Sequence, residues 1–374
     1  PVADLRVGIT TIREKWEKML RAKTSTLTEE YLSTKYPVKN ARGTILINGS
    51  ILPNRELVRK IKRLSVNESL VSEETIIAQR IDTEELAYSA EPDNEKINRI
   101  RMKEPCVKIG FPWEIFSKNG QAITTDFSSV TRGQKSQKPD SDNTVIGKGK
   151  LFISKSAKVN GATLNTENGP IYIGPDAEVM EGAMIRGPFA LCEGSTVKMG
   201  AKIYGPTTIG PKSKVGGELN NVVFQGYSNK AHDGFLGNSV IGSWCNIGAG
   251  TNSSNLKNTY EEIKLWNYPT HTFMRTGLQF CGLIMGDHSK CGINTMFNTG
   301  TVVGVSANVF GPGFQRNFIN SFTWGGTAGF TPYNFNKAIK VAQAVYKRRD
   351  LKLTNVDIDI LQHIYELSQT KKMY

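Results

Sequence analysis

The chain has 374 residues, 39% of them hydrophobic and 22% charged, and its net charge is +13. This composition is typical of a folded water-soluble protein with more than one domain, and it excludes a disordered chain. No stretch approaches the roughly eighteen consecutive apolar residues of a membrane span, so no membrane contact is expected. The positive charge suits small phosphorylated ligands, and the absence of a recognisable nucleic-acid module argues against a nucleic-acid partner.

The cysteines are odd in number, and none forms a close pair with another. They stand at Cys106, Cys192, Cys245, Cys281 and Cys291. This pattern argues against a disulfide framework or a zinc knuckle and favours a reducing, cytoplasmic location. No metal site is predicted from these residues.

Residues 1–143 lack any short repeat and predict an α/β domain. Ile12, Trp16 and Leu20 follow one another at a spacing of four, which predicts a helix. Residues 45–47 read as a buried strand with a turn after it, and Asn54 is a candidate cap for the helix that follows. Strand, turn and helix in series indicate the α/β class.

Residues 144–330 carry a repeat of six residues, which fits neither a helix nor an alternating strand. Its clearest run consists of Ile173, Val179, Ile185, Leu191, Val197, Ile203, Ile209 and Val215. A six-residue period is the signature of a hexapeptide β-helix, a triangular prism with about three short strands per coil. Prisms of this left-handed kind commonly assemble side by side, so a homotrimer is expected. The repeat breaks at residues 216–234 and 252–279, which we interpret as loops that leave the prism.

Residues 331–374 form a C-terminal tail. Residues 334–354 and 356–372 each have a helical pattern, with Thr354 or Asn355 as the cap of the second helix. The predicted order is therefore an α/β domain, an all-β left-handed parallel β-helix and terminal helices.

Two stretches resemble a known family. "SNKAHDGFLGNSVIGSWCNIGAGTNSSN" (residues 228–255) and "PVADLRVGITTIREKWEK" (residues 1–18) are similar to GlmU-like enzymes, and more closely to their shorter sugar-nucleotidyltransferase branch. GlmU enzymes are bifunctional and make UDP-N-acetylglucosamine. The resemblance implies an N-terminal nucleotidyltransferase domain and a β-helix that transfers an acetyl group from acetyl-CoA to an amino-sugar phosphate.

The resemblance also implies roles for individual residues. His232 takes the place of the general base, a role that imidazole chemistry supports independently. One residue separates Lys230 from His232 where the family has two, and Phe235 replaces a tyrosine. The implied contacts to the sugar phosphate are Lys230, Phe235, Asn246, Asn255 and Lys264, and those to acetyl-CoA are Cys281, Thr299 and Gly300.

The N-terminal domain departs from the family pattern. Ser50 stands where the family has an aspartate that binds magnesium, and serine is a poor replacement for a carboxylate. The glycine-rich phosphate loop is not found within the chain, and Lys15 either follows such a loop or is a helix-face residue. Mg²⁺ and a nucleoside triphosphate are therefore expected only if this domain is active.

Two other functions stay open. The first is a nucleotidyltransferase with a purely structural β-helix. The second is a non-catalytic trimeric scaffold, which is favoured by the departures from the family pattern at Phe235 and Ser50. Hexapeptide carbonic anhydrases bind zinc through two histidines five residues apart, a pair that this sequence lacks. Replacing His232 discriminates between the acetyltransferase and the scaffold.

Overall fold

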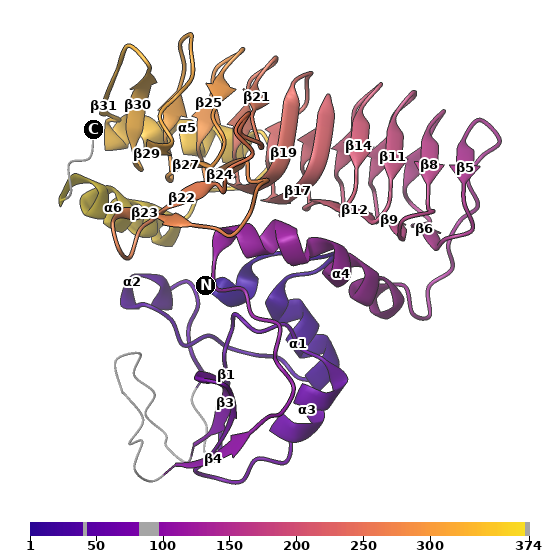
Figure 1. The fold of residues 1–374 in the computed structure, drawn as a ribbon, viewed down its shortest axis with the longest axis vertical. Helices are drawn as coiled ribbons and strands as arrows, with labels where there is room; N and C mark the ends of the chain where they lie inside the picture. The colour runs from indigo at the N-terminus through magenta and orange to yellow at the C-terminus, as the bar shows by residue number, and fades with distance from the viewer. Residues whose placement is uncertain (40–42, 82–96, 371–374) are drawn as a thin grey trace. The chain divides into compact units, whose positions relative to one another are not determined.

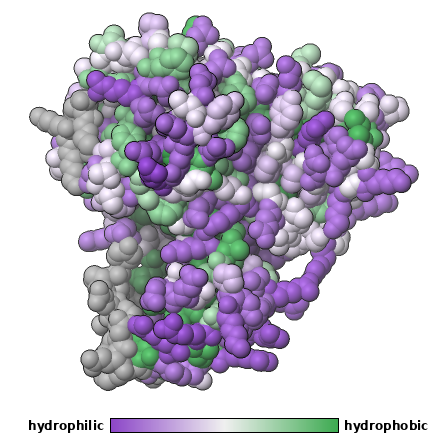
Figure 2. Space-filling model, in the orientation of Figure 1, coloured by the Kyte–Doolittle hydropathy of each residue, from purple (hydrophilic) through white to green (hydrophobic). Residues whose placement is uncertain are grey.

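The computed structural model describes residues 1–39, 43–81 and 97–370. These residues divide into two compact units. Unit 1 comprises residues 1–5, 10–110 and 354–360, and unit 2 comprises residues 6–9, 111–353 and 361–374. No helix in the described part of the chain is both long and apolar enough to cross a membrane. Hydrophilic residues predominate on the face drawn in Figure 2, with hydrophobic residues scattered among them.

Unit 1 is the predicted α/β region. Its sheet has the order β1-β3-β2-β4, with β2 and β4 parallel and the other pairs antiparallel. The strands are β1 (Ile45–Ile47), β2 (Glu68–Ser72), β3 (Thr75–Arg80) and β4 (Asn98–Arg101). The helical segments are η1 (Val2–Asp4), α1 (Ile12–Leu20), α2 (Glu30–Ser33) and α3 (Arg55–Ile61).

The structure confirms the elements that the sequence predicted here. Helix α1 buries Ile12 and Trp16, and the Trp16 indole N–H donates to the Ile51 carbonyl at 2.8 Å. Asn54 caps α3, because its side-chain oxygen accepts from the Leu57 amide at 2.8 Å. Strand β1 is only half-buried, so the prediction of a fully buried strand was wrong.

Unit 2 is built around a parallel β-helix, whose stacked coils are visible in Figure 1. One face is a 10-stranded sheet of mostly two-residue strands. Its strands are β7 (Lys158–Val159), β10 (Glu178–Val179), β13 (Thr196–Val197), β16 (Lys214–Val215), β18 (Asn229–Lys230), β20 (Asn246–Ile247), β25 (Lys290–Cys291), β28 (Asn308–Val309), β30 (Thr323–Gly326) and β31 (Gly329–Pro332). The two other faces form a 15-stranded sheet that bends around a corner within the long strands β17 and β19. Its strands are β5 (Thr144–Ile146), β6 (Leu151–Ile153), β8 (Thr163–Asn165), β9 (Ile171–Ile173), β11 (Met184–Arg186), β12 (Phe189–Leu191), β14 (Lys202–Tyr204), β15 (Thr207–Ile209), β17 (Glu218–Gly226), β19 (Phe235–Ser243), β21 (Asn252–Ser253), β24 (Leu283–Met285), β26 (Met296–Phe297), β27 (Thr301–Val303) and β29 (Phe318–Ile319).

The aliphatic residues of the predicted six-residue repeat form the core of the prism. All eight aliphatic residues of the clearest run belong to one buried cluster that continues along the coils. Val197 pairs with Val179 and Val215 in the parallel register that stacks one coil on the next. The predicted fold class is therefore confirmed.

Residues 216–234 do not leave the prism, so their prediction as a loop was wrong. Strands β17 and β18 occupy this stretch, with Leu219 opposite Ile203 and Phe224 opposite Ile209. Leu219 and Phe224 are five residues apart rather than six. The shorter step turns at Asn221, whose φ of 57° is left-handed. Val215 and Leu219 are only four residues apart, so two shortened steps together hid the repeat from a search for period six.

Asn252 and Ser253 still pair within the coil, but the other residues of the predicted loop 252–279 leave the prism, as predicted. They form an antiparallel hairpin of β22 (Lys264–Asn267) and β23 (Thr272–Arg275), in which Lys264 pairs with Arg275. The hairpin lies against β27 of the coil. It is the main insertion into the repeat.

A short N-terminal strap, defined here as residues 6–9, packs onto unit 2 together with α4 (Pro112–Val130). The Gly8 amide donates to Asn119 Oδ1 at 2.8 Å, and the Ile9 amide donates to Asp126 Oδ2 at 2.9 Å. The Thr208 hydroxyl donates to the Gly8 carbonyl at 3.1 Å. Helix α4 thus belongs to the same unit as the prism, although the predicted first domain, residues 1–143, included this stretch.

The two predicted C-terminal helices are present as α5 (Phe335–Lys347) and α6 (Asn355–Thr370). Asn334 caps α5 by accepting from the Lys337 amide at 3.1 Å. Thr354 caps α6 by accepting from the Asp357 amide at 3.2 Å. The last two residues of the second predicted helix, 371 and 372, lie outside the described residues.

Candidate functional site

A groove of about 370 Å³ runs along one edge of the prism, where several coils turn after the 10-stranded face. The groove exists because the coils are in register, so the residues after β13, β16, β18 and β20 emerge at the same edge. Its lining residues are Lys198, Met199, Gly216, Gly217, Ala231, His232, Asp233, Ala249 and Gly250. Most of these are small, which leaves the backbone accessible.

His232 and Asp233 both lie in this groove and both are exposed. The coil below passes directly under them. A Cβ added at Gly217 would lie 2.9 Å from the His232 carbonyl oxygen and 2.9 Å from the Asp233 Cα. Gly217 also has a φ of +69°, so glycine fits this position on both counts. The imidazole predicted to be the general base is therefore presented to solvent by a tightly stacked corner.

Lys230 lies inside the prism rather than in the groove. Its side chain is 1% exposed, and its ammonium donates to the Gly216 carbonyl at 3.0 Å and to the His232 carbonyl at 2.6 Å. Burial lowers the pKa of this ammonium to about 8, against the opposing effects of Asp233 and Cys291. A direct contact between Lys230 and a sugar phosphate does not fit this position.

Phe235 and Asn255 come together around Gly237. A Cβ at Gly237 would lie 2.4 Å from Asn255 Nδ2 and 2.7 Å from Phe235 Cζ. Asn255 Nδ2 also donates to Asn238 Oδ1 at 2.8 Å. These two predicted sugar contacts therefore share one patch, at the start of strand β19, which begins three residues after His232.

Asn246 is exposed on the 10-stranded face, in register with Asn229 and Lys290. It is not among the residues that line the groove. The structure thus separates Asn246 from the residues with which the sequence grouped it.

The predicted acetyl-CoA contacts meet Lys264 at the hairpin. A Cβ at Gly300 would lie 2.6 Å from the Lys264 carbonyl oxygen, and the Gly300 amide donates to the Cys281 carbonyl at 2.9 Å. The Thr299 carbonyl accepts from Asn317 Nδ2 at 2.6 Å. Cys281 is fully buried, so its thiol is a core group and only its backbone reaches this cluster.

The burial of the thiols makes a testable prediction. Burial raises the pKa of the Cys245 and Cys281 thiols to about 12, and Cys192 and Cys291 are also buried, whereas Cys106 is half-buried. Because the thiolate is the reactive form, we expect one fast equivalent with a disulfide reagent at pH 8 in the native protein. All five cysteines of the chain should react in guanidinium chloride. Two or more fast equivalents in the native state would contradict the described packing.

Sequence reasoning missed Lys198, Met199 and Ala249 as site residues. Lys198 is half-buried and supplies a cation beside the groove, while Met199 is 69% exposed. The six-residue repeat could have identified Lys198, because this residue directly follows Val197, which stacks on Val215 in the next coil. Residues two coils before a motif share its edge of the prism.

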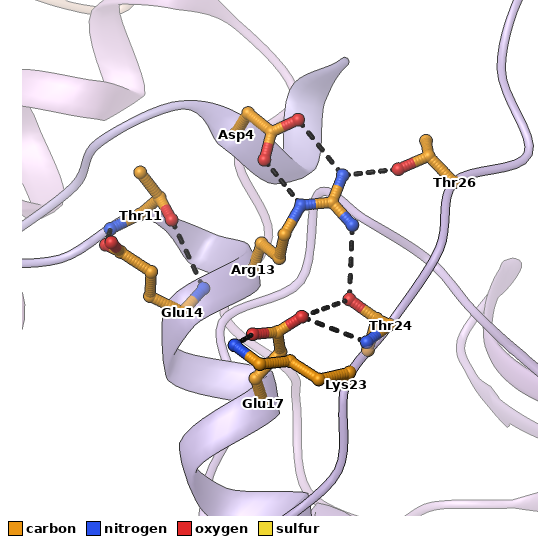
Figure 3. Close-up of polar contacts among 8 residues, drawn as sticks. All are labelled: Asp4, Thr11, Arg13, Glu14, Glu17, Lys23, Thr24 and Thr26. Carbon is orange, nitrogen blue, oxygen red and sulfur yellow. Dashed lines mark hydrogen bonds and ion pairs between the residues drawn. The ribbon is translucent and has the colours of Figure 1, made fainter. Parts of the chain in front are cut away.

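Unit 1 contains a polar network around α1, drawn in Figure 3. Arg13 binds both carboxylate oxygens of Asp4, at 2.5 and 3.0 Å, and also contacts Thr24 and Thr26. Lys15 donates at 3.1 Å to the carbonyl and at 3.1 Å to the hydroxyl of Thr10. This local pairing fits the helix-face interpretation of Lys15.

The turn after β1 is closed by Ser50, whose hydroxyl donates to Asn48 Oδ1 at 2.7 Å. Among the described residues, no group of three or more His, Cys, Asp or Glu side chains is arranged to hold a metal ion. The donor set at Ser50 therefore does not fit magnesium, which favours carboxylate oxygens.

Residues 1–135 match the family model described as sugar nucleotidyl transferase. A bifunctional sugar-1-phosphate nucleotidylyltransferase/acetyltransferase of Sulfurisphaera tokodaii is 24% identical over 227 residues, which are 60% of this chain and 49% of that protein. The chain thus spans about half the length of this curated relative.

Two solved structures overlap with the chain at low similarity. One is a polysialic acid-specific acetyltransferase, with 13% identity, 52% of this chain and 88% of that chain covered, and a TM-score of 0.29. The other is an N-acyltransferase from Bacillus cereus in complex with dTDP-4-amino-4,6-dideoxyglucose and coenzyme A, with 14% identity, 55% and 91% covered, and a TM-score of 0.23. Overlaps with TM-scores this low support no inference about this chain.

Proposed function

We propose that this chain is a sugar-phosphate-modifying transferase that moves an acetyl group from acetyl-CoA to the amine of an amino-sugar phosphate. The observation that carries the proposal is the exposed His232 imidazole in a groove on a rigid, tightly stacked corner. The bifunctional relative, in whose name acetyl transfer appears, supports the same reading. A homotrimer in the cytoplasm remains part of this proposal.

The chemistry requires a base beside an attacking amine. In the proposed reaction the amine nitrogen attacks the thioester carbonyl, and a ring nitrogen of His232 accepts the proton that the amine loses. The new C–N bond forms as the C–S bond breaks, and the departing thiolate takes the proton from the imidazolium. Among the residues that line the groove, Lys198 supplies a cation for the charge that develops on the carbonyl oxygen or for a substrate phosphate.

Two patches of unit 2 outside the groove would hold the rest of the substrates. The Phe235 ring and the Asn255 amide around Gly237 suit the sugar, because a ring face and an amide are common contacts for hydroxylated rings. The hairpin cluster of Lys264, Thr299 and Gly300 would receive the coenzyme A arm. Asn246 would take part only if a bound substrate extends across the 10-stranded face.

Nucleotidyl transfer by the N-terminal region is a second proposed activity, and the family match over residues 1–135 favours it. The Ser50 turn lacks the carboxylate oxygens that magnesium favours. Binding of a nucleotide and of Mg²⁺ by the N-terminal region should therefore be measured together with nucleotidyl transfer.

The experiment for acetyl transfer is a coenzyme A release assay. Acetyl-CoA is supplied with glucosamine-1-phosphate and a panel of other amino-sugar phosphates, and free thiol is measured. Release with one acceptor supports the proposal and identifies the substrate. Silence with every acceptor, from folded protein, contradicts acetyl transfer and favours the scaffold or the nucleotidyl activity, which UTP and dTTP with sugar-1-phosphates then test.

A further inference from the structure

Lys230 occupies a position that the fold otherwise reserves for apolar side chains. It stands opposite Val215 in the parallel register, and Asn229 opposite Asn246 places Ile247 next in the same column. Val215 and Ile247 belong to the buried core. An amine in a dry interior loses hydration free energy, so a leucine or methionine would fill this column at a lower cost in stability.

The contacts of the ammonium indicate what this lysine does. Its two acceptors, the Gly216 and His232 carbonyls, lie on successive coils, and both residues line the groove. The Gly216 amide in turn donates to the Lys230 carbonyl at 2.7 Å. The side chain therefore joins two coils from the inside, at the point where the chain turns outward to present His232.

We propose that Lys230 is a positioning residue whose buried ammonium fixes the Gly216 and His232 carbonyls and thereby sets the place of the His232 imidazole in the groove. The effect of Lys230 on catalysis rests on the proposed function, whereas its effect on the conformation of His232 is independent of that function. This role replaces the substrate contact that the sequence motif suggested for Lys230.

The groups around the ammonium agree with this role. Burial disfavours its charged form, and the Asp233 carboxylate favours it. Asp233 is exposed in the same groove, next to His232 in the chain. A protonated Lys230 donates to both carbonyls and still has one N–H to offer.

Lys290 provides a matched control within the chain. Its ammonium donates to the His288 carbonyl at 2.7 Å, so it also holds the carbonyl of a histidine two positions away, although on the N-terminal side, and burial also lowers its pKa. Lys290 lies outside the column of interior side chains and is not among the residues that line the groove. Lys230→Met and Lys290→Met therefore each remove an ammonium bond to a histidine carbonyl, at different corners, and only Lys230→Met also removes a bond to a second coil.

The test follows the four histidine ring signals by NMR in the full chain, with His232 assigned from a His232→Gln variant. We expect Lys230→Met to broaden or split the His232 signal and leave His288 unchanged, and Lys290→Met to do the reverse. A single sharp, unshifted His232 signal in folded Lys230→Met would overturn the proposal. If that variant does not fold, Lys230→Gln, which keeps N–H donors but is shorter, is measured in the same way.

Kinetics supply the second readout. In Lys230→Met we expect kcat for acetyl transfer to fall by about ten- to a hundredfold with KM changed less than about twofold, because a displaced base slows the chemical step rather than binding. Equal kcat in wild type and Lys230→Met would overturn the catalytic part of the proposal. If wild type transfers no acetyl group, the proposed function fails, and the NMR result alone decides the role of Lys230.

Discussion

The His232→Ala variant is expected to lose acetyl transfer by about 10²- to 10⁴-fold in kcat/KM while keeping its fold, because removal of a general base has an effect of this size. The side chain is exposed in the groove, so its loss leaves no cavity in the core. Coenzyme A release with the acceptor found for wild type measures the effect.

His363→Ala is the matched control, since His363 lies on α6 and the sequence gives it no site role. It should retain wild-type activity. A loss of less than about fivefold in His232→Ala would remove His232 from catalysis and favour the scaffold interpretation of the prism. An equal loss in both variants would show that the effect is not specific to the groove.

The Gly8→Ala variant is expected to lower the free energy of unfolding by about 3 kcal/mol or more, near the upper range for single substitutions. A Cβ at Gly8 would lie 2.5 Å from Asp126 Oδ2 and 2.8 Å from the Ala122 backbone, and the φ of +84° already disfavours alanine. Because Gly8 lies between α4 and the prism, relief of the clash would break the bonds that the strap makes to Asn119 and Asp126.

Gly133→Ala isolates the backbone contribution. Gly133 has a similar φ of +76°, but nothing lies within 4 Å of its added Cβ, so we expect a loss of only about 1–2 kcal/mol. Thermal melting followed by circular dichroism compares the two variants. If Gly8→Ala melts at the same temperature as Gly133→Ala, the strap is not packed as described.

Much of the fold could be predicted because the prism repeats a simple rule. Each aliphatic residue from Ile173 to Val215 points inward, and six residues are enough to identify the next one. The rule failed after Val215, where a step of four residues to Leu219 and a step of five to Phe224 hid two strands. Spacing patterns reveal a repeat only where its corners have equal length.

The strap and α4 could not be predicted for a different reason. The Gly8 amide finds its partner in Asn119, 111 residues later, and no local pattern records such a pairing. Buried polar side chains such as Asn119 and Asp126 also resemble exposed ones in a sequence, because only the structure shows what they bind.

The candidate site was predicted in part. The motif pointed to His232, and the structure places this residue in the groove. The motif grouped Lys230 with the substrate contacts. The six-residue step from Phe224 to Lys230, however, indicates that the Lys230 side chain points into the prism. Residues contributed by earlier coils, such as Lys198 and Met199, were missed because they lie outside the motif.

A crystal structure of the protein with coenzyme A and an amino-sugar phosphate tests the central claim most directly. We expect the coenzyme A sulfur and the acceptor amine to lie in the groove lined by Met199, Gly217 and Ala249, with the amine within hydrogen-bond reach of His232. Both ligands bound elsewhere on the chain, with the groove free of them, would contradict it.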